Sequence, residues 1–460
     1  MLWQNRRNMK KVLVIGLGIS GIGSLKLLKG RAELFAYDAK KEEEIKDETK
    51  ALLDEMGVSC FFGTDPKGPF DQVVVSPAVP MDNPIVSKLR SEGSEIIGEM
   101  ELAYRYCKGS FIGITGTNGK TTTTTLVGEI MKNGGKDTMV VGNIGAAVSE
   151  VCEKATEDTV MVTELSSFQL ETVSEFHVHI SAILNLTPDH LDRHKTFEGY
   201  IAAKARILEN QTLADFFIYN ADDLETAKLA ETVDHVNKVP FSAKEGCESL
   251  SLLSNAAYVS EGNIVVKAGG KEHKICPVDA LQIPGHHNLE NALAAAAIGI
   301  FAGIKAKSIG KTMRAFKGVE HRLEFVRELK GVRYINDSKG TNPDASIKAL
   351  EAMPAPIIII AGGYDKHLDF TDYINAMKGK VEYMLLLGAT ADQIEETALK
   401  CGFSDDRIIK CSSLEVCVAS AAKLAEKGFT VLLSPACASW GMFENYEQRG
   451  REFKRLVKEL

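Results

Sequence analysis

The stretch ITGTNGKTTTTT, residues 114–125, determines the fold expected of the central part of this chain. It follows the apolar run Phe111–Ile114 and continues into TLVGEIMKN, a helix-like segment. A glycine-rich turn between a strand and a helix, carrying Lys and Thr, is typical of a phosphate-binding loop. The pattern therefore predicts a P-loop ATPase-like, mostly parallel sheet around this segment.

Each part of the loop has an expected role. Gly116 and Gly119 leave backbone N–H groups free to point at phosphate oxygens, and Lys120 brings positive charge to the β- and γ-phosphates. Ile114 stands where the common pattern has its first glycine, so the loop is a shorter G-x-x-G-K-T. A glycine turn that only caps a helix is the alternative, but Gly-Lys-Thr at such a junction is uncommon by chance. The expected ATP-binding residues are Gly116, Thr117, Asn118, Gly119, Lys120, Thr121 and Thr122, with the Thr121 hydroxyl as a Mg²⁺ ligand.

Composition narrows the class of protein. The 460 residues, with 45% hydrophobic and 25% charged side chains, are those of a globular protein of about three domains. The net charge of −8 argues against a nucleic-acid partner. The nine cysteines include no C-x-x-C pair, so we expect neither disulfides nor a zinc site, and a cytoplasmic protein with reduced thiols.

Membrane insertion and secretion are not expected. No apolar run approaches the ~18 residues that a membrane span needs. The segment RRNMKKVLVIGLGISGIG has an apolar part interrupted by glycine and no A-x-A-like cleavage site, unlike a signal peptide. Met9 is an alternative start, which would make residues 1–8 an extension.

The order of apolar runs predicts three α/β domains. In residues 1–108, VLVIG (12–16), ELFAYD (33–38) and QVVVSP (72–77) alternate with helical patterns, as in a Rossmann-like domain. A central domain is expected over 109–320. A second Rossmann-like domain is expected over 321–460, where four apolar runs separated by helical stretches include PIIIIAGG (356–363).

The segment GLGISG, residues 16–21, follows a strand and precedes Asp38 by about 20 residues. This meets the dinucleotide fingerprint, which alone is a weak signal. It fits NAD, any nucleotide diphosphate, or close packing of a helix on a sheet. A nicotinamide-dependent oxidoreductase stays an alternative, although no other segment is arranged for hydride chemistry.

Other polar residues follow predicted strands of the central domain. Glu164 ends a strand beside the phosphate loop and is a plausible Mg²⁺ ligand. His190 lies closest to the next strand end, whereas His194 is read as a surface residue. Lys204 lies in a helical pattern, where a lysine is normally solvent-facing.

A further group of polar residues marks the last third of the chain. Asn288 and Asn291 are three apart at a helix start, either as N-cap residues or as ligand contacts. Arg322, Asp337, Lys339 and Thr341 lie at a strand end and loop, and Asp337 could accept from a ribose hydroxyl. Lys366 and Ser439 follow two more strands.

Taken together, these segments resemble the Mur ligase family, the ATP-dependent amide-forming enzymes of peptidoglycan assembly. The resemblance covers almost the whole chain. The pieces that carry it are GLGISG, SPAVP, GTNGKTT, GNIG, ELSSFQL, LNLTPDHLDRH, AAKARI, HHNLENALAA, HRLE, NDSKGTNP and SPACASWGMFENYEQRGREF. Two matched positions depart from the family's form: Trp440 stands where a smaller aliphatic residue is usual, and Ala39 stands where a polar residue is usual.

The resemblance implies two small-molecule substrates, UDP-N-acetylmuramoyl-L-alanine and D-glutamate, and a monomeric enzyme. The first domain would hold UDP, with contacts from Ile19, Ser20, Asp38, Ser76 and Pro77. The sugar-peptide substrate or a metal would meet Asn143 and His190. D-glutamate would meet Lys339, Thr341, Lys366, Ser439 and Tyr446, and further ATP contacts would be Asn288, Asn291, Arg322 and Asp337.

The resemblance also implies two Mg²⁺ ions. Thr121 and Glu164 would hold the first. Lys204 matches the family's carbamylated lysine, which would ligate the second ion with Glu164 and His190. Lys120, His190 and Lys204 are therefore the expected catalytic residues, and His190 or solvent would take the proton of the attacking amine. A non-catalytic nucleotide-binding switch is the third functional class considered.

Overall fold

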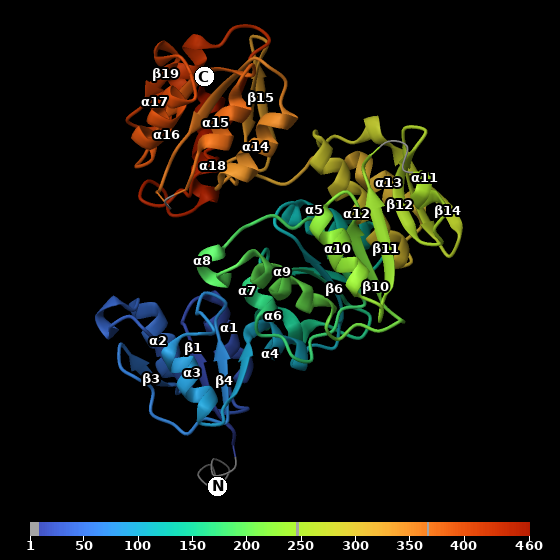
Figure 1. Ribbon diagram of the computed structural model, residues 1–460. Coiled ribbons are helices and arrows are strands. Elements are labelled where there is room, and N and C mark those ends of the chain that lie inside the picture. Colours follow the sequence, from blue (N-terminus) through green and yellow to red (C-terminus); the bar gives the residue numbers. More distant parts are fainter. Residues whose placement is uncertain (1–8, 245–247, 366–367) are drawn as a thin grey trace. The chain divides into compact units, whose positions relative to one another are not determined.

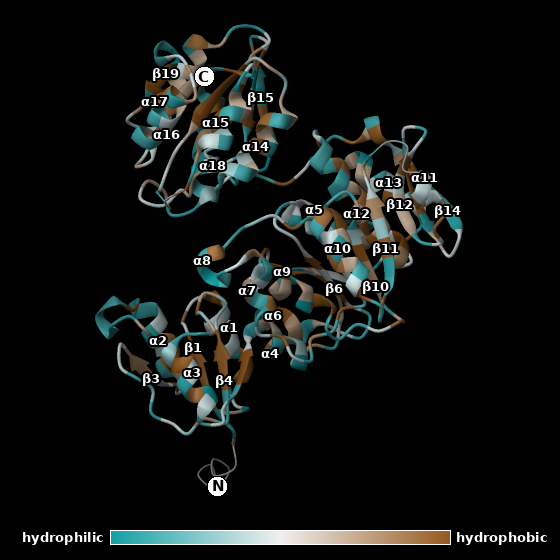
Figure 2. Cartoon of the chain, viewed as in Figure 1, coloured by the Kyte–Doolittle hydropathy of each residue, from teal (hydrophilic) through white to brown (hydrophobic). Residues whose placement is uncertain are grey.

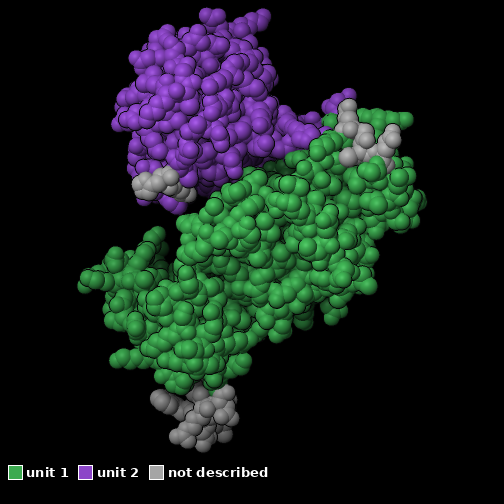
Figure 3. Space-filling view, viewed as in Figure 1, with its two compact units in different colours: residues 1–278, 290–313 green, residues 279–289, 314–460 purple. Residues whose placement is uncertain are grey.

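The computed structural model describes residues 9–244, 248–365 and 368–460, in which helices and strands alternate around three sheets (Figure 1). The prediction of a mostly parallel α/β fold is confirmed. The chain forms two compact units, residues 1–278 with 290–313 and residues 279–289 with 314–460 (Figure 3). In the described part of the chain, no helix has the length and apolar character that crossing a bilayer requires.

The first sheet is parallel, with the strand order β3-β2-β1-β4-β5. Its order reverses at β1, and α/β sheets bind ligands beside such a reversal, here at the carboxyl ends of β1 and β4. Its strands are β1 Lys11–Ile15, β2 Glu33–Asp38, β3 Ser59–Phe62, β4 Gln72–Val75 and β5 Glu95–Gly98. Its helices are α1 Ile19–Leu28, η2 Glu42–Glu44, α2 Asp47–Met56, α3 Pro84–Ser91 and α4 Glu99–Tyr106.

The central sheet has nine strands in the order β14-β13-β12-β11-β10-β9-β6-β8-β7, parallel except for the antiparallel pairs β12–β13 and β13–β14. The strands are β6 Ser110–Thr115, β7 Thr138–Gly142, β8 Val160–Glu164, β9 Ile180–Ile183, β10 Phe216–Asn220, β11 Asn237–Ser242, β12 Ala256–Ser260, β13 Asn263–Ala268 and β14 Lys271–Pro277. Four strands of the three sheets were not predicted: β5, β10, β15 (Glu324–Leu329) and β19 (Ile408–Lys410).

The helices of the central region surround this sheet. They are α5 Lys120–Asn133, α6 Val148–Val151, η3 Cys152–Lys154, α7 Ser167–Leu170, α8 Leu191–His194, α9 Phe197–Ala205, η4 Arg206–Leu208, α10 Leu224–Thr232, α11 Glu248–Ser251, η5 Val278–Ala280, α12 His286–Phe301 and α13 Ala306–Ala315. Helix α12 contributes its first residues to the second unit and the rest to the first.

The third sheet, in the second unit, has the order β15-β16-β20-β17-β18-β19, with only β15 antiparallel. Its strands are β15 Glu324–Leu329, β16 Val332–Asn336, β17 Ile357–Ala361, β18 Val381–Leu386, β19 Ile408–Lys410 and β20 Thr430–Leu433. Its helices are α14 Pro343–Ala352, α15 Thr371–Met377, α16 Ala391–Lys400, η6 Asp405–Arg407, α17 Leu414–Leu424 and α18 Tyr446–Glu459.

The strands at the centre of the sheets are apolar on both faces. Every residue of β4 and of β17 is buried, and Figure 2 shows β4 in the colour of hydrophobic residues. Helices on both faces of a parallel sheet require such continuous apolar runs. This is why these strands were readable from the sequence.

A buried carboxylate ties the first sheet to the central one. Glu101 on α4 is fully buried and accepts hydrogen bonds from the backbone N–H groups of Ser174 (2.8 Å), Glu175 (3.1 Å) and Phe176 (3.0 Å). Arg105 also donates to it, at 2.9 Å. One hydrophobic cluster runs through both sheets alongside this contact. The two sheets therefore fold as one compact unit.

The division into three domains with boundaries at 109 and 321 remains a prediction. Three sheets occupy the three predicted ranges. Contacts divide the chain into two units, and residues 314–320 belong with the last sheet.

The Glu101 contact generates a stability prediction. Glu101→Gln replaces a charged acceptor by an amide whose N–H₂ group faces backbone donors, so we expect the free energy of unfolding to fall by about 2–3 kcal/mol. Urea denaturation followed by circular dichroism measures the change. Glu129→Gln, at an exposed position on α5, is the matched control. Equal stability of the two variants would contradict the assigned role of Glu101.

Candidate active site

The phosphate loop has the predicted strand-turn-helix geometry. It leaves β6 at Thr115 and enters α5 at Lys120. Gly116 and Gly119 have φ values of +147° and +83°. A Cβ on Gly119 would lie 2.2 Å from Oδ1 of Asn291, so only glycine fits there. The first N–H groups of α5 therefore border a cradle without side chains.

The loop is held by a residue that the sequence analysis missed. Asn185, just after β9, accepts from the backbone N–H of Asn118 at 2.8 Å and donates to its carbonyl at 3.2 Å. The carbonyl of Asn185 also accepts from the N–H of Thr117 at 3.0 Å. Its position after a strand end in LNLTPDH is the signal that could have identified it.

Two lysine side chains meet at one carbonyl oxygen of the loop. Lys120 Nζ donates to Gly116 O at 2.9 Å, and Lys204 Nζ donates to the same oxygen at 2.8 Å. Lys204 is 1% exposed, so the expectation of a solvent-facing lysine is wrong. Burial, and then the neighbouring Lys120 ammonium, hold the pKa of Lys204 well below its usual value. The structure thus makes this ammonium easier to deprotonate than an exposed lysine.

Glu164 offers an oxygen that fits a metal ion. Its Oε1 accepts from Asn143 Nδ2 at 2.9 Å, while its buried Oε2 has no hydrogen-bond partner in the described structure. Leaving a buried carboxylate oxygen unpaired is costly unless a cation or ligand compensates. Glu164 ends β8, which is paired with the loop strand β6. A hard carboxylate oxygen on the strand next to the phosphate-loop strand suits Mg²⁺.

The two histidines of LNLTPDHLDRH have different environments. His190 has a φ of +53°, and its Nε2 lies 3.6 Å from Asp189 Oδ2. Burial, opposed by Asp189, lowers the pKa of His190, and Lys120 and Lys204 lower it further. The side chain of His194 is only 4% exposed, and its Nε2 lies 2.9 Å from Ser167 Oγ, so reading it as a surface residue is wrong.

The carboxyl ends of the first sheet are built around its glycine loop. Ser76 Oγ donates to Gly16 O at 2.9 Å, and Asp38 accepts from the N–H of Leu17 at 3.0 Å. A Cβ on Gly21 would lie 1.8 Å from Gly16 O, whereas a Cβ on Gly18 would have no neighbouring atom within 4 Å. The structure thus brings Ile19, Ser20, Asp38, Ser76 and Pro77 to one edge of this sheet, with Ile19 74% exposed.

The first sheet and the His190 segment are joined within the same unit. Arg193 Nη2 donates to the carbonyl of Val79 at 3.0 Å and to Glu171 Oε2 at 2.5 Å. Val79 follows the Ser76–Pro77 turn. The loop after β9 is therefore fixed against the ligand edge of the first sheet.

In the second unit, Asp337 is fully buried between cationic and hydroxyl groups. Its Oδ1 lies 3.6 Å from Arg322 Nη1, and Ser434 Oγ donates to its Oδ2 at 2.8 Å. Burial raises the pKa of Asp337 to about 6, against the lowering effect of Arg322. Arg449, which the sequence analysis missed, is buried nearby and donates to the carbonyls of Ser338 and Cys437.

Other predicted residues of the second unit lie on loops at the carboxyl edge of the third sheet. Lys339 Nζ is 5.4 Å from the ring centre of Tyr446, and Ser439 is buried in the loop after β20. Thr341 lies in the loop between β16 and α14. Lys366 lies outside the described residues.

The N-cap reading of Asn288 and Asn291 is wrong. Helix α12 begins at His286, and the carbonyl of Gly285 accepts from the N–H groups of Asn288 and Leu289. Asn288 Nδ2 donates to Pro284 O at 2.6 Å, and Asn291 Oδ1 accepts from Thr123 Oγ1 at 3.2 Å. Asn291 thus contacts the phosphate-loop helix α5.

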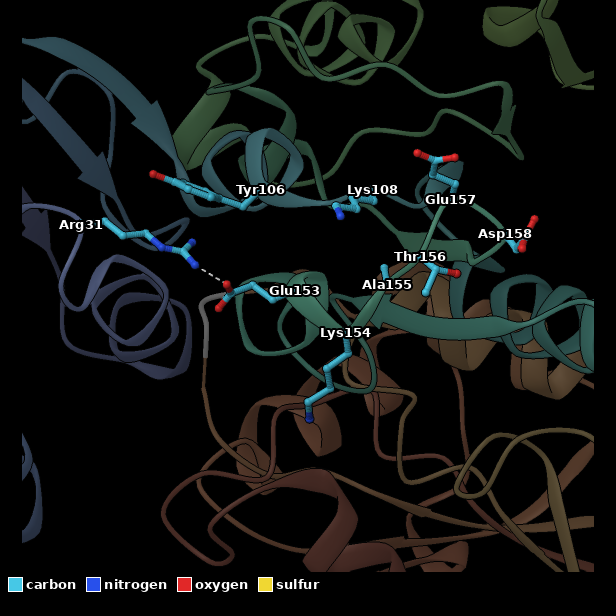
Figure 4. A pocket seen from close by; sticks show the side chains of 9 residues that line it. All are labelled: Arg31, Tyr106, Lys108, Glu153, Lys154, Ala155, Thr156, Glu157 and Asp158. Atoms are coloured by element: carbon cyan, nitrogen blue, oxygen red, sulfur yellow. Dashed lines mark hydrogen bonds and ion pairs between the residues drawn. The ribbon is translucent and has the colours of Figure 1, made fainter.

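A cavity of about 710 Å³ lies elsewhere, where α1, α4 and the segment before β8 meet (Figure 4). Its lining residues are Arg31, Tyr106, Lys108, Glu153, Lys154, Ala155, Thr156, Glu157 and Asp158. The side chain of Arg31 pairs with Glu153 and lies over the ring of Tyr106. Lys108 and Asp158 precede β6 and β8, so the cavity faces the edge opposite the phosphate loop.

Comparison with known proteins identifies the family. Residues 114–299 match the Mur ligase middle domain and residues 321–437 match the Mur ligase, glutamate ligase domain. UDP-N-acetylmuramoylalanine–D-glutamate ligase of Thermoanaerobacter sp. (strain X514) is 47% identical over 455 residues, 98% of each chain. The protein of the same name from Alkaliphilus oremlandii (strain OhILAs) is 48% identical over 457 residues, again 98% of each chain. The chain belongs to the Mur ligase family.

Solved Mur ligase structures share the fold. MurC from Thermotoga maritima matches with a TM-score of 0.58 and 21% identity, covering 98% of this chain and all of that one. MurF from Acinetobacter baumannii matches with a TM-score of 0.61 and 16% identity, covering 97% and 93%. The predicted family and three-part α/β architecture are therefore confirmed.

Family membership decides between the classes considered from sequence. Mur ligases use ATP and Mg²⁺, which agrees with a phosphate loop next to the unpartnered Glu164 oxygen. Membership in a family of ATP-dependent ligases argues against the two alternatives considered from the sequence, a nicotinamide-dependent oxidoreductase and a non-catalytic nucleotide-binding switch. The individual site residues stay predictions.

The Asp337 environment generates a pH prediction. The folded-state pKa of Asp337, about 6, lies above the usual aspartate value of 3.8, so the folded state binds the proton more tightly and stability falls as pH rises from about 4 to about 6. Asp337→Asn should reduce this fall by about 2–3 kcal/mol. Urea denaturation at pH 4 and pH 7 measures the change in the free energy of unfolding between the two pH values. Asp372→Asn, at an exposed position, is the control. Parallel pH profiles for wild type and Asp337→Asn would contradict the assignment.

Proposed function

We propose that this chain joins D-glutamate to UDP-N-acetylmuramoyl-L-alanine in an ATP-dependent reaction that forms a peptidoglycan precursor. The observation that carries the proposal is identity of 47% over 98% of both chains with a ligase named for that reaction. The reaction belongs in the cytoplasm, where ATP is available, and the enzyme acts as a monomer on small molecules.

The phosphate loop would hold ATP while a substrate carboxylate attacks its γ-phosphate. Backbone N–H groups of Gly119–Thr122, at the start of α5, would face the phosphates. Lys120 Nζ would turn from the Gly116 and Thr117 carbonyls toward them. The products are ADP and an acyl phosphate. The D-glutamate amine then attacks the acyl carbon, phosphate leaves, and His190 or solvent takes the amine proton.

The chain would hold two Mg²⁺ ions beside this loop. Thr121 and Glu164 fit the first, since Asn143 fixes one carboxylate oxygen and leaves the other unpartnered. His190, Glu164 and a carbamylated Lys204 fit the second. When bound, the ions supply positive charge to the phosphates, which offsets the repulsion between an attacking carboxylate and ATP.

The environment of Lys204 supports its carbamylation. A lowered pKa makes Lys204 easier to deprotonate, and the lone pair of the deprotonated Nζ can add to the carbon of CO₂ with loss of a proton. The resulting anion would replace repulsion between Lys204 and Lys120 by attraction. Its burial at 1% exposure would protect the carbamate from water.

The remaining predicted contacts complete the proposal. The uridine diphosphate would lie at the edge formed by Ile19, Ser20, Asp38, Ser76 and Pro77, where the backbone of Gly18 is open to close approach. ATP would also meet Asn288, Asn291, Arg322 and Asp337. D-glutamate would meet Lys339, Thr341, Lys366, Ser439 and Tyr446.

Phosphate release from ATP tests the proposed reaction. With UDP-N-acetylmuramoyl-L-alanine and Mg²⁺, we expect release when D-glutamate is added and little with L-glutamate, D-aspartate or D-alanine. Lys120→Ala should lower this activity by at least ~100-fold while the circular dichroism spectrum is unchanged. Equal release with every amino acid, or none with D-glutamate, would overturn the proposed substrate.

Chemical rescue tests the carbamate. Lys204→Ala should lose most activity, and a short carboxylate such as acetate should restore part of it by occupying the place of the carbamate. Lys228→Ala, a partly exposed lysine on α10, is the matched control and should be neither impaired nor rescued. Full activity of Lys204→Ala without acetate would show that no carbamate is needed.

A further inference from the structure

Two histidines and an aspartate lie together at the amino edge of the central sheet. His177 and His179 precede β9 at Ile180, and Asp215 immediately precedes β10 at Phe216. Residues two apart in an extended segment point to the same face, so the histidines share one side. Ile180 pairs with Phe216 in the parallel register, which places Asp215 beside His179.

The polar atoms of this His-His-Asp cluster converge. His177 Nε2 lies 2.9 Å from Asp215 Oδ2, and His179 Nδ1 lies 3.0 Å from Asp215 Oδ1. One ligand atom from each of the three side chains lies within 4.8 Å of the others. The two rings are almost perpendicular, with centres 4.8 Å apart.

The cluster is held in place by its surroundings yet is reachable from solvent. The Asp215 side chain is 1% exposed, and Thr212 donates to its Oδ2 from the backbone N–H at 2.8 Å and from the hydroxyl at 3.0 Å. The backbone of His179 bonds to Phe111 and Phe216 on the neighbouring strands. The side chains of His177 and His179 are 25% and 61% exposed, so water could complete a coordination sphere.

We propose that His177, His179 and Asp215 bind a divalent transition-metal ion of the Zn²⁺ class. Two imidazoles and one carboxylate form a mixed nitrogen and oxygen set that suits Zn²⁺, whereas Mg²⁺ takes oxygen ligands. Ligands about 2.0–2.2 Å from a tetrahedral zinc ion lie roughly 3.3–3.6 Å apart. The two nitrogen–oxygen pairs, at 2.9 and 3.0 Å, need to open by only a few tenths of an ångström to reach this spacing. When the ion binds, the hydrogen bonds from His177 Nε2 and His179 Nδ1 to Asp215 are replaced by bonds from these nitrogens to the ion.

This metal site is separate from the proposed chemistry. The phosphate loop leaves the carboxyl end of β6, and the cluster lies at the amino ends of the neighbouring strands. Six residues of β6 at about 3.3 Å each separate the two edges by roughly 20 Å. The ion would therefore tie β9 to β10 and stabilise the folded chain without touching the substrates.

The experiment uses untagged full-length protein in excess Mg²⁺, which keeps the sites for Mg²⁺ occupied. Zn²⁺ is titrated in competition with a chromogenic chelator, and Co²⁺ binding is followed by visible absorption. We expect His177→Gln and His179→Gln each to weaken the affinity for Zn²⁺ at least ~10-fold, because replacing even a residue that only hydrogen-bonds to a metal ligand typically has an effect of that size. Zn²⁺ should raise the melting temperature of wild type, and this rise should be lost in His179→Gln.

The control is His273→Gln, a histidine on β14 outside the cluster, which should bind as wild type does. His179→Gln is the milder variant, because this side chain is largely exposed and its replacement should leave the fold intact. Equal Zn²⁺ affinity in wild type and both cluster variants would overturn the proposal. A sulfur-to-cobalt charge-transfer band would also overturn it, because it would assign the ion to cysteine.

Discussion

The carbonyl oxygen of Gly116 is the point on which the candidate active site depends. It accepts hydrogen bonds from both Lys120 and Lys204, which brings two like charges together in a largely buried place. Two ammonium groups about 4 Å apart would repel by about 4 kcal/mol at an effective dielectric constant of 20. The arrangement is stable when one lysine is neutral or when anions enter. The site is therefore built for negative ligands, and the chemistry of Lys204 follows from the same constraint.

The direction of the strands organises the remaining groups. Glu164 ends β8, the phosphate loop follows β6, and Asn185 and His190 follow β9, which are neighbouring parallel strands. Parallel strands deliver their carboxyl ends to one edge, so residues separated by up to about 70 positions meet there without any long-range sequence signal. The His-His-Asp cluster occupies the opposite edge for the same geometric reason, since its residues precede their strands.

This geometry explains which features could be predicted from the sequence. Strands such as β17 are continuous apolar runs because both faces are buried, and site loops were found because they follow such runs. Strand β10, FFIYN between acidic loops, was missed although it fills the sheet between β9 and β11. The burial of Lys204, the hold of Asn185 on the loop and the start of α12 at His286 depend on tertiary neighbours. Local pattern favoured other readings at Lys204 and Asn288, and only the resemblance to a family indicated the lysine's role.

The Glu101 carboxylate has an evolutionary consequence. Its three backbone partners, Ser174 to Phe176, lie more than 70 residues further along the chain, beyond the phosphate loop. Recombination that exchanged the first sheet between relatives would lose this contact, at a cost of about 2–3 kcal/mol, unless the incoming α4 carried an acid at the same position. The contact thus sets a stability condition on any exchange of the first sheet, and so on new substrate specificities that would arise by such an exchange.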